Sequence, residues 1–140
     1  SHWKKILLGI LIWMVVRVVF FGFTSDKLQG SSSFQQILDD LEEQVNSTLP
    51  NMVDDETRLD SVNSGALSLT YYFTLVNAEV DLLDIEYFRS EMEISLKQHI
   101  CDSDSFDIFK GEGVLMNYVY LDRLGEYVTK AAFNAGDCPK

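Results

Sequence analysis

The sequence predicts an α+β domain that follows a single membrane-spanning helix. Three observations support this: an apolar run near the start of the chain, two stretches with helical spacing of apolar residues, and two pairs of segments in which apolar and polar residues alternate. At 140 residues the chain has room for one domain and an accessory segment. We divide it into a cytoplasmic tip and transmembrane anchor (1–23), a linker (24–33) and a folded domain (34–140).

The predicted anchor is an apolar run over residues 6–23, in which Arg17 is the single charge. As a helix this run would be roughly 27 Å long, close to the bilayer core of about 30 Å. Lys4 and Lys5 precede it, and no further Lys or Arg occurs before Lys27. The positive-inside rule therefore places the N-terminus in the cytoplasm and the domain in the periplasm, across a bacterial inner membrane. A cleaved signal peptide is the rival interpretation, but its apolar region is usually shorter and small residues follow it.

Arg17 lies six residues from the outer end of the run, roughly 9 Å along a helix. The simplest interpretation is that its long side chain reaches the headgroups. The alternative is that Arg17 contacts an acidic or carbonyl-lined site on another membrane protein, because intramembrane charges often mark function. Arg17 is therefore a candidate for partner binding.

Charge is distributed unevenly along the chain. The three charges before residue 24 give +3, whereas from Thr24 onward 8 basic and 22 acidic residues give −14, within a total of −11. An acidic domain repels phosphate backbones, so we expect no nucleic-acid partner. Residues 24–33, "TSDKLQGSSS", are polar and rich in Ser and Gly, which is typical of a flexible tether.

The first half of the domain is expected to be one helix and one hairpin. Ser33 is a suitable N-cap for a helix over 34–48, in which Phe34 begins a stripe of apolar residues at helical spacing. Residues 57–62 and 66–76 read as strands, and the turn residues at 63–65 predict an antiparallel hairpin between them.

The second half repeats this order. Asp84 is expected to cap a helix over 84–100, and "SDSFDIF" is expected to form a short helical turn. Residues 113–121 and 126–133 are rich in β-forming residues and predict a second hairpin. The order α-β-β-α-β-β predicts an antiparallel sheet with the helices packed on one face.

Cys101 and Cys138 are the two cysteines of the chain. An even pair in an exported domain predicts a disulfide, which would stabilise the fold by about 4 kcal/mol. No C-x-x-C motif is present, and His2 and His99 do not complete a zinc site, so we expect no metal and no cofactor.

The domain offers little for catalysis. His99 is its single histidine, at a predicted helix end, and no nucleophile–base set is apparent, so we predict that the protein is not an enzyme. The segment 102–113 begins like a calcium loop, but Phe106, Asp107 and Gly113 stand where a ligand, a glycine and a glutamate are needed.

The corner "LPNMVDDETRLDSV" is the one stretch of the domain that suggests a contact surface. Arg58 stands among acidic residues there, either in a local ion pair or on a partner-binding surface. With Arg58 the candidates for partner binding are Met52, Asp54 and Asp55.

This corner, followed by "LTYYFTLVN", Cys101, "GVLMNYVYLDRLGEYV" and a final "DC", resembles a group of small exported or membrane-anchored bacterial envelope proteins of uncharacterised function. The resemblance covers residues 45–138. It implies bacterial origin, export and a cysteine pair, and it implies no activity.

These observations together predict a single-pass membrane protein that acts by binding an integral membrane or periplasmic protein. We expect an accessory or regulatory subunit of an envelope complex. The alternative is an inhibitor or immunity factor, encoded by mobile DNA, that blocks a membrane channel or an injected protein.

Overall fold

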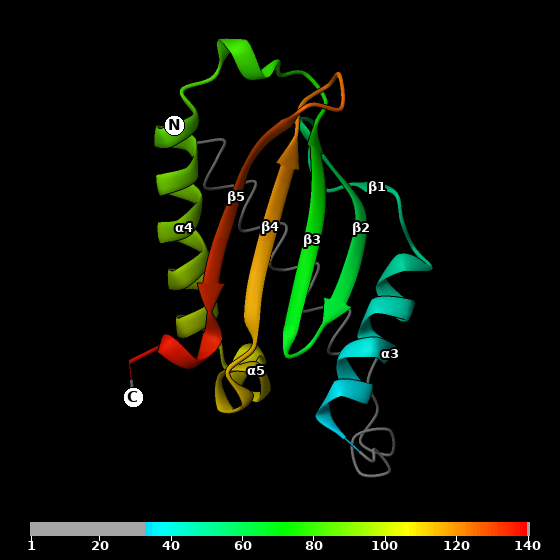
Figure 1. Ribbon diagram of the computed structural model, residues 1–140, viewed down its shortest axis with the longest axis vertical. Coiled ribbons are helices and arrows are strands. Elements are labelled where there is room, and N and C mark those ends of the chain that lie inside the picture. Colours follow the sequence, from blue (N-terminus) through cyan, green and yellow to red (C-terminus); the bar gives the residue numbers. More distant parts are fainter. Residues whose placement is uncertain (1–32, 140) are drawn as a thin grey trace.

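The computed structural model describes residues 33–139, which form a five-stranded sheet and three α-helices (Figure 1). The strand order follows the sequence, β1-β2-β3-β4-β5. The elements are α3 Phe34–Asn46, β1 Asn51–Met52, β2 Thr57–Gly65, β3 Ser68–Leu75, α4 Ile85–Asp102, α5 Asp107–Glu112, β4 Leu115–Leu121 and β5 Tyr127–Asn134. The α+β class is confirmed.

The predicted anchor with Arg17, and residues 24–32 of the predicted linker, lie outside the described residues. Within residues 33–139, no helix combines the length and the apolar character needed to span a bilayer.

Helix α3 begins where the sequence predicts. Ser33 Oγ accepts a hydrogen bond from the Gln36 backbone N at 3.2 Å, so the serine is the N-cap. The helix ends at Asn46, two residues before the predicted end at 48. The Asn46 side chain pairs with the edge of β2 instead, donating to Val62 O and accepting from Val62 N, both at 2.8 Å. α3 is thereby fixed along the β2 edge of the sheet.

Strands β2 and β3 form the predicted antiparallel hairpin, with the turn at Ala66 and Leu67 instead of 63–65. Gln35 of α3 holds this turn, because its side chain accepts from Leu67 N at 3.1 Å and donates to Gly65 O at 2.8 Å. Strand β1, which the sequence did not indicate, pairs with β2 over only two residues. Two residues are too few for alternation to be recognised.

The prediction of an entirely antiparallel sheet is wrong, because β3 and β4 run parallel. Helix α4 lies between them in the sequence and returns the chain to the end of the sheet at which β3 begins (Figure 1). Such a helical crossover is the usual way to join neighbouring parallel strands. β4 and β5 then form the predicted second hairpin, so the sheet is mixed.

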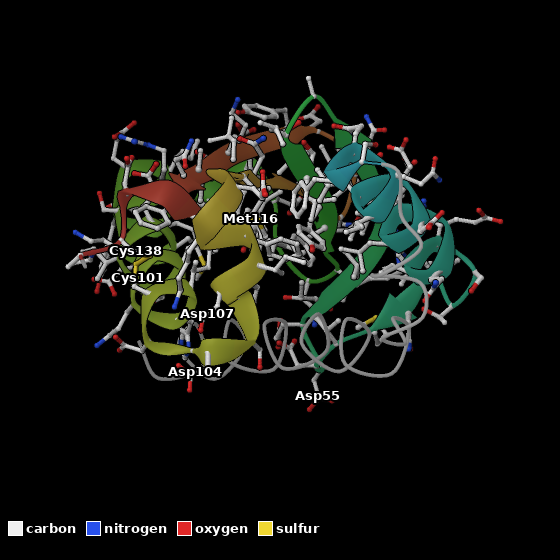
Figure 2. All side chains as sticks on the ribbon, turned by 90° about the horizontal axis from the view of Figure 1, so that it is seen from below. Asp55, Cys101, Asp104, Asp107, Met116 and Cys138 are labelled. Atoms are coloured by element: carbon white, nitrogen blue, oxygen red, sulfur yellow. A yellow bond between two sulfur atoms is a disulfide. The ribbon has the colours of Figure 1, made fainter. Side chains whose placement is uncertain are left out.

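Helix α4 is fixed at both ends. Asp84 Oδ1 accepts from Tyr87 N at 3.2 Å, as expected of the predicted cap. At the other end Cys101 forms a disulfide with Cys138, which follows β5, and the two Cα atoms are 5.3 Å apart (Figure 2). The disulfide links the C-terminal end of α4 to the segment that follows β5.

The hydrophobic core lies on one face of the sheet. α3 packs chiefly against β2 and α4 chiefly against β5, at the two sides of the sheet (Figure 1). Their buried side chains join one core with the inward-facing residues of the strands. The predicted helical stripes are buried as expected: Leu38, Leu41 and Val45 in α3, and Phe88, Met92, Leu96 and Ile100 in α4. The opposite face, which we call the open face, carries the alternating residues such as Arg58, Tyr72 and Lys130.

Candidate functional site

The centre of the core is a set of six side chains on the two parallel strands, which we call the aromatic face. Each of the six is at most 1% exposed. The register places them in facing pairs: Leu69 with Met116, Tyr71 with Tyr118, and Phe73 with Tyr120. The Tyr71 and Tyr118 rings meet edge to face, with centroids 5.1 Å apart, and the Phe73 and Tyr120 rings are stacked at 5.2 Å.

Two hydroxyl groups on the aromatic face have no hydrogen-bond partner. Tyr71 Oη and Tyr118 Oη are both buried, and no described residue pairs with either. The hydroxyl of Tyr120, by contrast, lies 3.5 Å from Met92 Sδ. A buried hydroxyl without a partner costs about 1–3 kcal/mol, so such groups are uncommon in a stable core.

Burial also determines the protonation of these phenols. It raises the pKa of Tyr71 well above 10, and the neighbouring Tyr118 raises it further. Burial likewise raises the pKa of Tyr118. Both groups are therefore neutral at physiological pH and can each donate or accept a hydrogen bond. The aromatic face is therefore a buried apolar layer with two hydroxyl groups at its centre that have no hydrogen-bond partner.

Asp54 lies near the Tyr120 end of the aromatic face. The pKa of Tyr120 is raised chiefly by burial, then by the neighbouring Tyr118, and also by the charge of Asp54. Its Oδ1 accepts from Glu56 N at 2.7 Å and from Thr57 N at 2.9 Å. Its Oδ2 is buried and has no partner among the described residues. Burial raises the pKa of Asp54, although the two backbone hydrogen bonds oppose this.

Arg58 lies on the open face and forms a local ion pair. Its Nε is 2.5 Å from Asp60 Oδ1, and its Nη2 donates to Thr74 Oγ1 at 3.3 Å. Thr74 Oγ1 in turn donates to Asp60 Oδ2 at 2.5 Å. Arg58 and Asp60 are two residues apart in β2, so their side chains lie on the same face of the sheet. Each polar group of this cluster has a partner.

The structure therefore does not bring the predicted corner residues onto one surface. Met52 stands opposite Arg58 in register, so both belong to the open face, and Met52 is 44% exposed. Asp55 is exposed and points away from the domain (Figure 2). Asp54 turns inward toward the aromatic face. Arg17 lies outside the described residues.

The acidic segment 102–113 is organised around a lysine. It folds into the end of α4, a 3-10 turn at Asp104–Phe106, and α5 (Figure 2). Lys110 Nζ donates to Asp107 Oδ1 at 3.0 Å and to the backbone oxygens of Cys101 and Ser103 at 3.0 and 3.1 Å. Within residues 33–139 no three His, Cys, Asp or Glu side chains are grouped as metal ligands would be.

Tyr71 and Tyr118 are the residues that sequence reasoning missed. The signal for each is present, because Tyr71 alternates with Leu69 and Phe73, and Tyr118 with Met116 and Tyr120. What the sequence does not show is that the two strands are neighbours. Without that pairing, two unpartnered hydroxyls on one face cannot be predicted.

Two solved structures resemble this fold. A Pseudomonas aeruginosa protein thought to be secreted superposes with a TM-score of 0.60 at 14% identity, over 78% of this chain and 100% of that one. The pilotin EpsS of the Vibrio vulnificus type 2 secretion system superposes with a TM-score of 0.57 at 9% identity, over 76% of this chain and 92% of that one. At these identities the likeness concerns the fold alone.

No curated protein matches the sequence. A family model does match, over residues 32–128, and it is described as a domain of unknown function. The chain therefore belongs to the DUF8479 family, a family of domains of unknown function.

Proposed function

We propose that this is an exported, membrane-attached bacterial envelope protein that acts by binding another protein, as an accessory or regulatory subunit of a membrane complex. The observation that carries the proposal is the likeness in fold to a type 2 secretion pilotin, together with the Cys101–Cys138 disulfide. We further propose that the partner contacts the exposed corner that holds Met52 and Asp55.

The chemistry of the aromatic face does not favour catalysis. Its side chains are apolar or neutral phenols, and their raised pKa values keep them from acting as bases at physiological pH. We therefore propose that the protein is not an enzyme.

The proposed location is the outer side of a bacterial inner membrane. Lys4 and Lys5 before the apolar run 6–23 support this orientation, and the Cys101–Cys138 disulfide is typical of an oxidising compartment. The likeness in fold to a type 2 secretion pilotin and to a protein thought to be secreted fits an accessory role in the envelope.

The test is site-specific photocrosslinking in native membranes. Benzoylphenylalanine at Asp55, exposed and next to Asp54, should capture one membrane or periplasmic protein, whereas the same group at Tyr127, 60% exposed on the open face, should not. Equal capture from both positions, or no protein adduct from either, would contradict the proposal. Capture of a membrane channel or an injected protein would favour the alternative, an inhibitor or immunity factor encoded by mobile DNA.

A further inference from the structure

We propose that the open face binds the open face of a second copy of this chain, so that two sheets pack face to face in a symmetric dimer. The inference goes beyond the proposed function, because it concerns another surface and another partner. Three observations support it: the apolar side chains that the open face exposes, the pairing of charges that the strand register allows, and the area of the sheet.

The open face presents apolar side chains that no described helix covers. The two long helices, α3 and α4, lie at the sides of the sheet and contribute to the core on its aromatic face (Figure 1). The apolar residues of the open face come from three strands: Tyr72, Leu115, Val119, Leu121 and Tyr127. Each is half-buried or exposed. Apolar side chains that are gathered on one accessible face are typical of an interaction surface.

The strand register arranges the open face into rows that run across the sheet, because residues opposite one another in neighbouring strands share a face. One row consists of Arg58, Thr74, Leu121 and Tyr127. The next row contains Tyr72, Val119 and Lys130. Asp60 lies between the two rows, because the register of β2 and β3 shifts at this residue. One side of the open face therefore carries Arg58 and Asp60 on β2, and the other side carries Tyr127 and Lys130 on β5.

A symmetric pairing of two such sheets brings these two sides together. A twofold axis that runs parallel to the strands, between the sheets, places β2 against β5 of the second copy and β3 against β4. Each row then faces the same row of the second copy in reverse order. Arg58 lies over the ring of the second copy's Tyr127, which favours a cation. Asp60 lies close to the second copy's Lys130, and every contact occurs twice.

The distribution of charge favours a second copy at this face over any other face of the domain. From Thr24 onward the chain carries a charge of −14, so two copies repel each other across most of their surface. Strands β2 to β5 contain three charged residues, Arg58, Asp60 and Lys130, of which two are cations. Lys130 is exposed and forms no ion pair with a described residue. The second copy's Asp60 provides the missing carboxylate.

The area of the open face is sufficient for a weak dimer. β3 has 8 residues, which is about 26 Å at 3.3 Å per residue, and four strands about 4.8 Å apart span about 19 Å. One open face therefore covers roughly 500 Å², and two facing copies bury roughly 1,000 Å² together, about the smallest area of a specific interface. We expect a reversible dimer with a dissociation constant above about 1 μM.

The experiment uses the full chain with benzoylphenylalanine in place of Val119, which stands opposite Tyr72 in the middle of the open face. An equal mixture of isotope-labelled and unlabelled chain is irradiated at several protein concentrations, digested and analysed by mass spectrometry. We expect adducts between chains to the peptide that contains Tyr72, with a yield that rises with concentration. The same group in place of Ile94, 63% exposed on α4, is the control and should give no such adduct. Adducts only within one chain, only to other peptides, or none at all would overturn the proposal.

Charge variants test the predicted pairing in the same assay. Lys130→Glu should lower the yield of the interchain adduct about tenfold, because in each of two contacts a glutamate would then face Asp60. Lys130→Arg should keep the yield. Lys97→Glu on α4 makes the same change of charge at another exposed lysine, and it should leave the yield unchanged. Circular dichroism checks that each variant is folded. An unchanged yield for Lys130→Glu, or an equal loss for Lys97→Glu, would overturn the proposal.

This proposal and the proposed function fail separately. A second copy captured from position 119 supports the dimer whether or not another protein is captured from position 55. Tyr127 also belongs to the open face, so a second copy captured from position 127 supports the dimer, whereas a different protein captured there counts against the proposed function. Capture of a different protein in place of a second copy from position 119 would overturn the dimer.

Discussion

The polar side chains on the two faces of the sheet differ in their hydrogen bonding. On the open face, Arg58, Asp60 and Thr74 pair with one another, although the side chains of Arg58 and Asp60 are partly exposed to water. On the aromatic face, the hydroxyls of Tyr71 and Tyr118 are shut off from water and have no described partner. The unpaired groups thus occur where they are most costly. This contrast indicates that polar contacts stabilise the open face, whereas apolar burial stabilises the aromatic face and outweighs the cost of its two unpaired hydroxyls.

The largest expected effect concerns the disulfide that holds α4 beside the aromatic face. Cys101→Ala with Cys138→Ala should lower the free energy of unfolding by about 4 kcal/mol, because the bond closes a sequence separation of 37 residues in the unfolded chain. Urea denaturation followed by circular dichroism measures this. Wild-type protein unfolded with a reductant should match the variant. A loss below about 1 kcal/mol would show that α4 holds its place without the bond.

The next largest effect on stability is expected for Asp122, which connects the β4–β5 turn by hydrogen bonds to the chain before α4. Its Oδ2 accepts from Val80 N at 2.9 Å, and its Oδ1 accepts from Leu124 N at 2.8 Å and Glu126 N at 2.9 Å. Asp122→Asn should destabilise the fold clearly, because one of these N–H groups would then face an amide NH2.

The pKa of Asp122 adds a pH test to this prediction. The hydrogen bond from Val80 N is the largest of the causes that lower the pKa of Asp122 below 3.8. The contribution of the Asp122 carboxylate to the free energy of unfolding is therefore complete above pH 3.8. It is lost as the pH falls through the lowered pKa. Stability of Asp122→Asn should depend less on pH in that acid range. An identical acid transition in both proteins would contradict this assignment.

A direct comparison of the faces uses two smaller changes. Thr74→Val on the open face should lower the free energy of unfolding by about 1 kcal/mol, because Arg58 loses an acceptor and Asp60 a donor. Tyr118→Phe on the aromatic face should instead raise the free energy of unfolding, by about 1 kcal/mol or more, because it removes a buried hydroxyl that has no hydrogen-bond partner. Denaturant midpoints of the two variants provide the test. A loss of stability in Tyr118→Phe would reveal a hydrogen bond to that hydroxyl.

The smallest effect is expected for Asp54→Asn. Asparagine keeps the oxygen that accepts from Glu56 N and Thr57 N, and it removes a buried charge. Burial raises the pKa of Asp54, so its favourable contribution is complete below pH 3.8 and is lost as the pH rises through the raised pKa. At neutral pH the variant should be as stable as the wild type or slightly more so, as measured by its thermal midpoint. Clear destabilisation at neutral pH would point to a cationic partner for Asp54 Oδ2.

Local patterns predicted the elements well. Helical spacing located α3 and α4, with Ser33 and Asp84 as their caps. Alternation located the first hairpin, and segments rich in β-forming residues located the second. These features depend on residues close in sequence. The parallel pairing of β3 with β4 does not, because it depends on where α4 returns the chain. The antiparallel sheet was predicted wrongly for that reason.

The candidate site was predictable only in part. The corner stretch drew attention to Asp54 and Arg58, but Arg58 lies on the open face opposite Thr74, whereas Asp54 turns inward toward Tyr120. Asp54 lies in the loop before β2, where no alternation indicates the direction of a side chain. The meeting of Tyr71 with Tyr118 likewise requires the long-range pairing of two strands, which no local pattern contains.

The parallel seam between β3 and β4 has a consequence for how the chain assembles. Each half of the sheet is a hairpin whose strands are neighbours in the sequence, so each can form early and alone. Joining the halves must wait until the long crossover has closed, which costs more chain entropy than either turn. The turns are then already formed at the rate-limiting step. Changes within either turn should therefore mainly slow refolding, as should changes to the rings that meet across this seam.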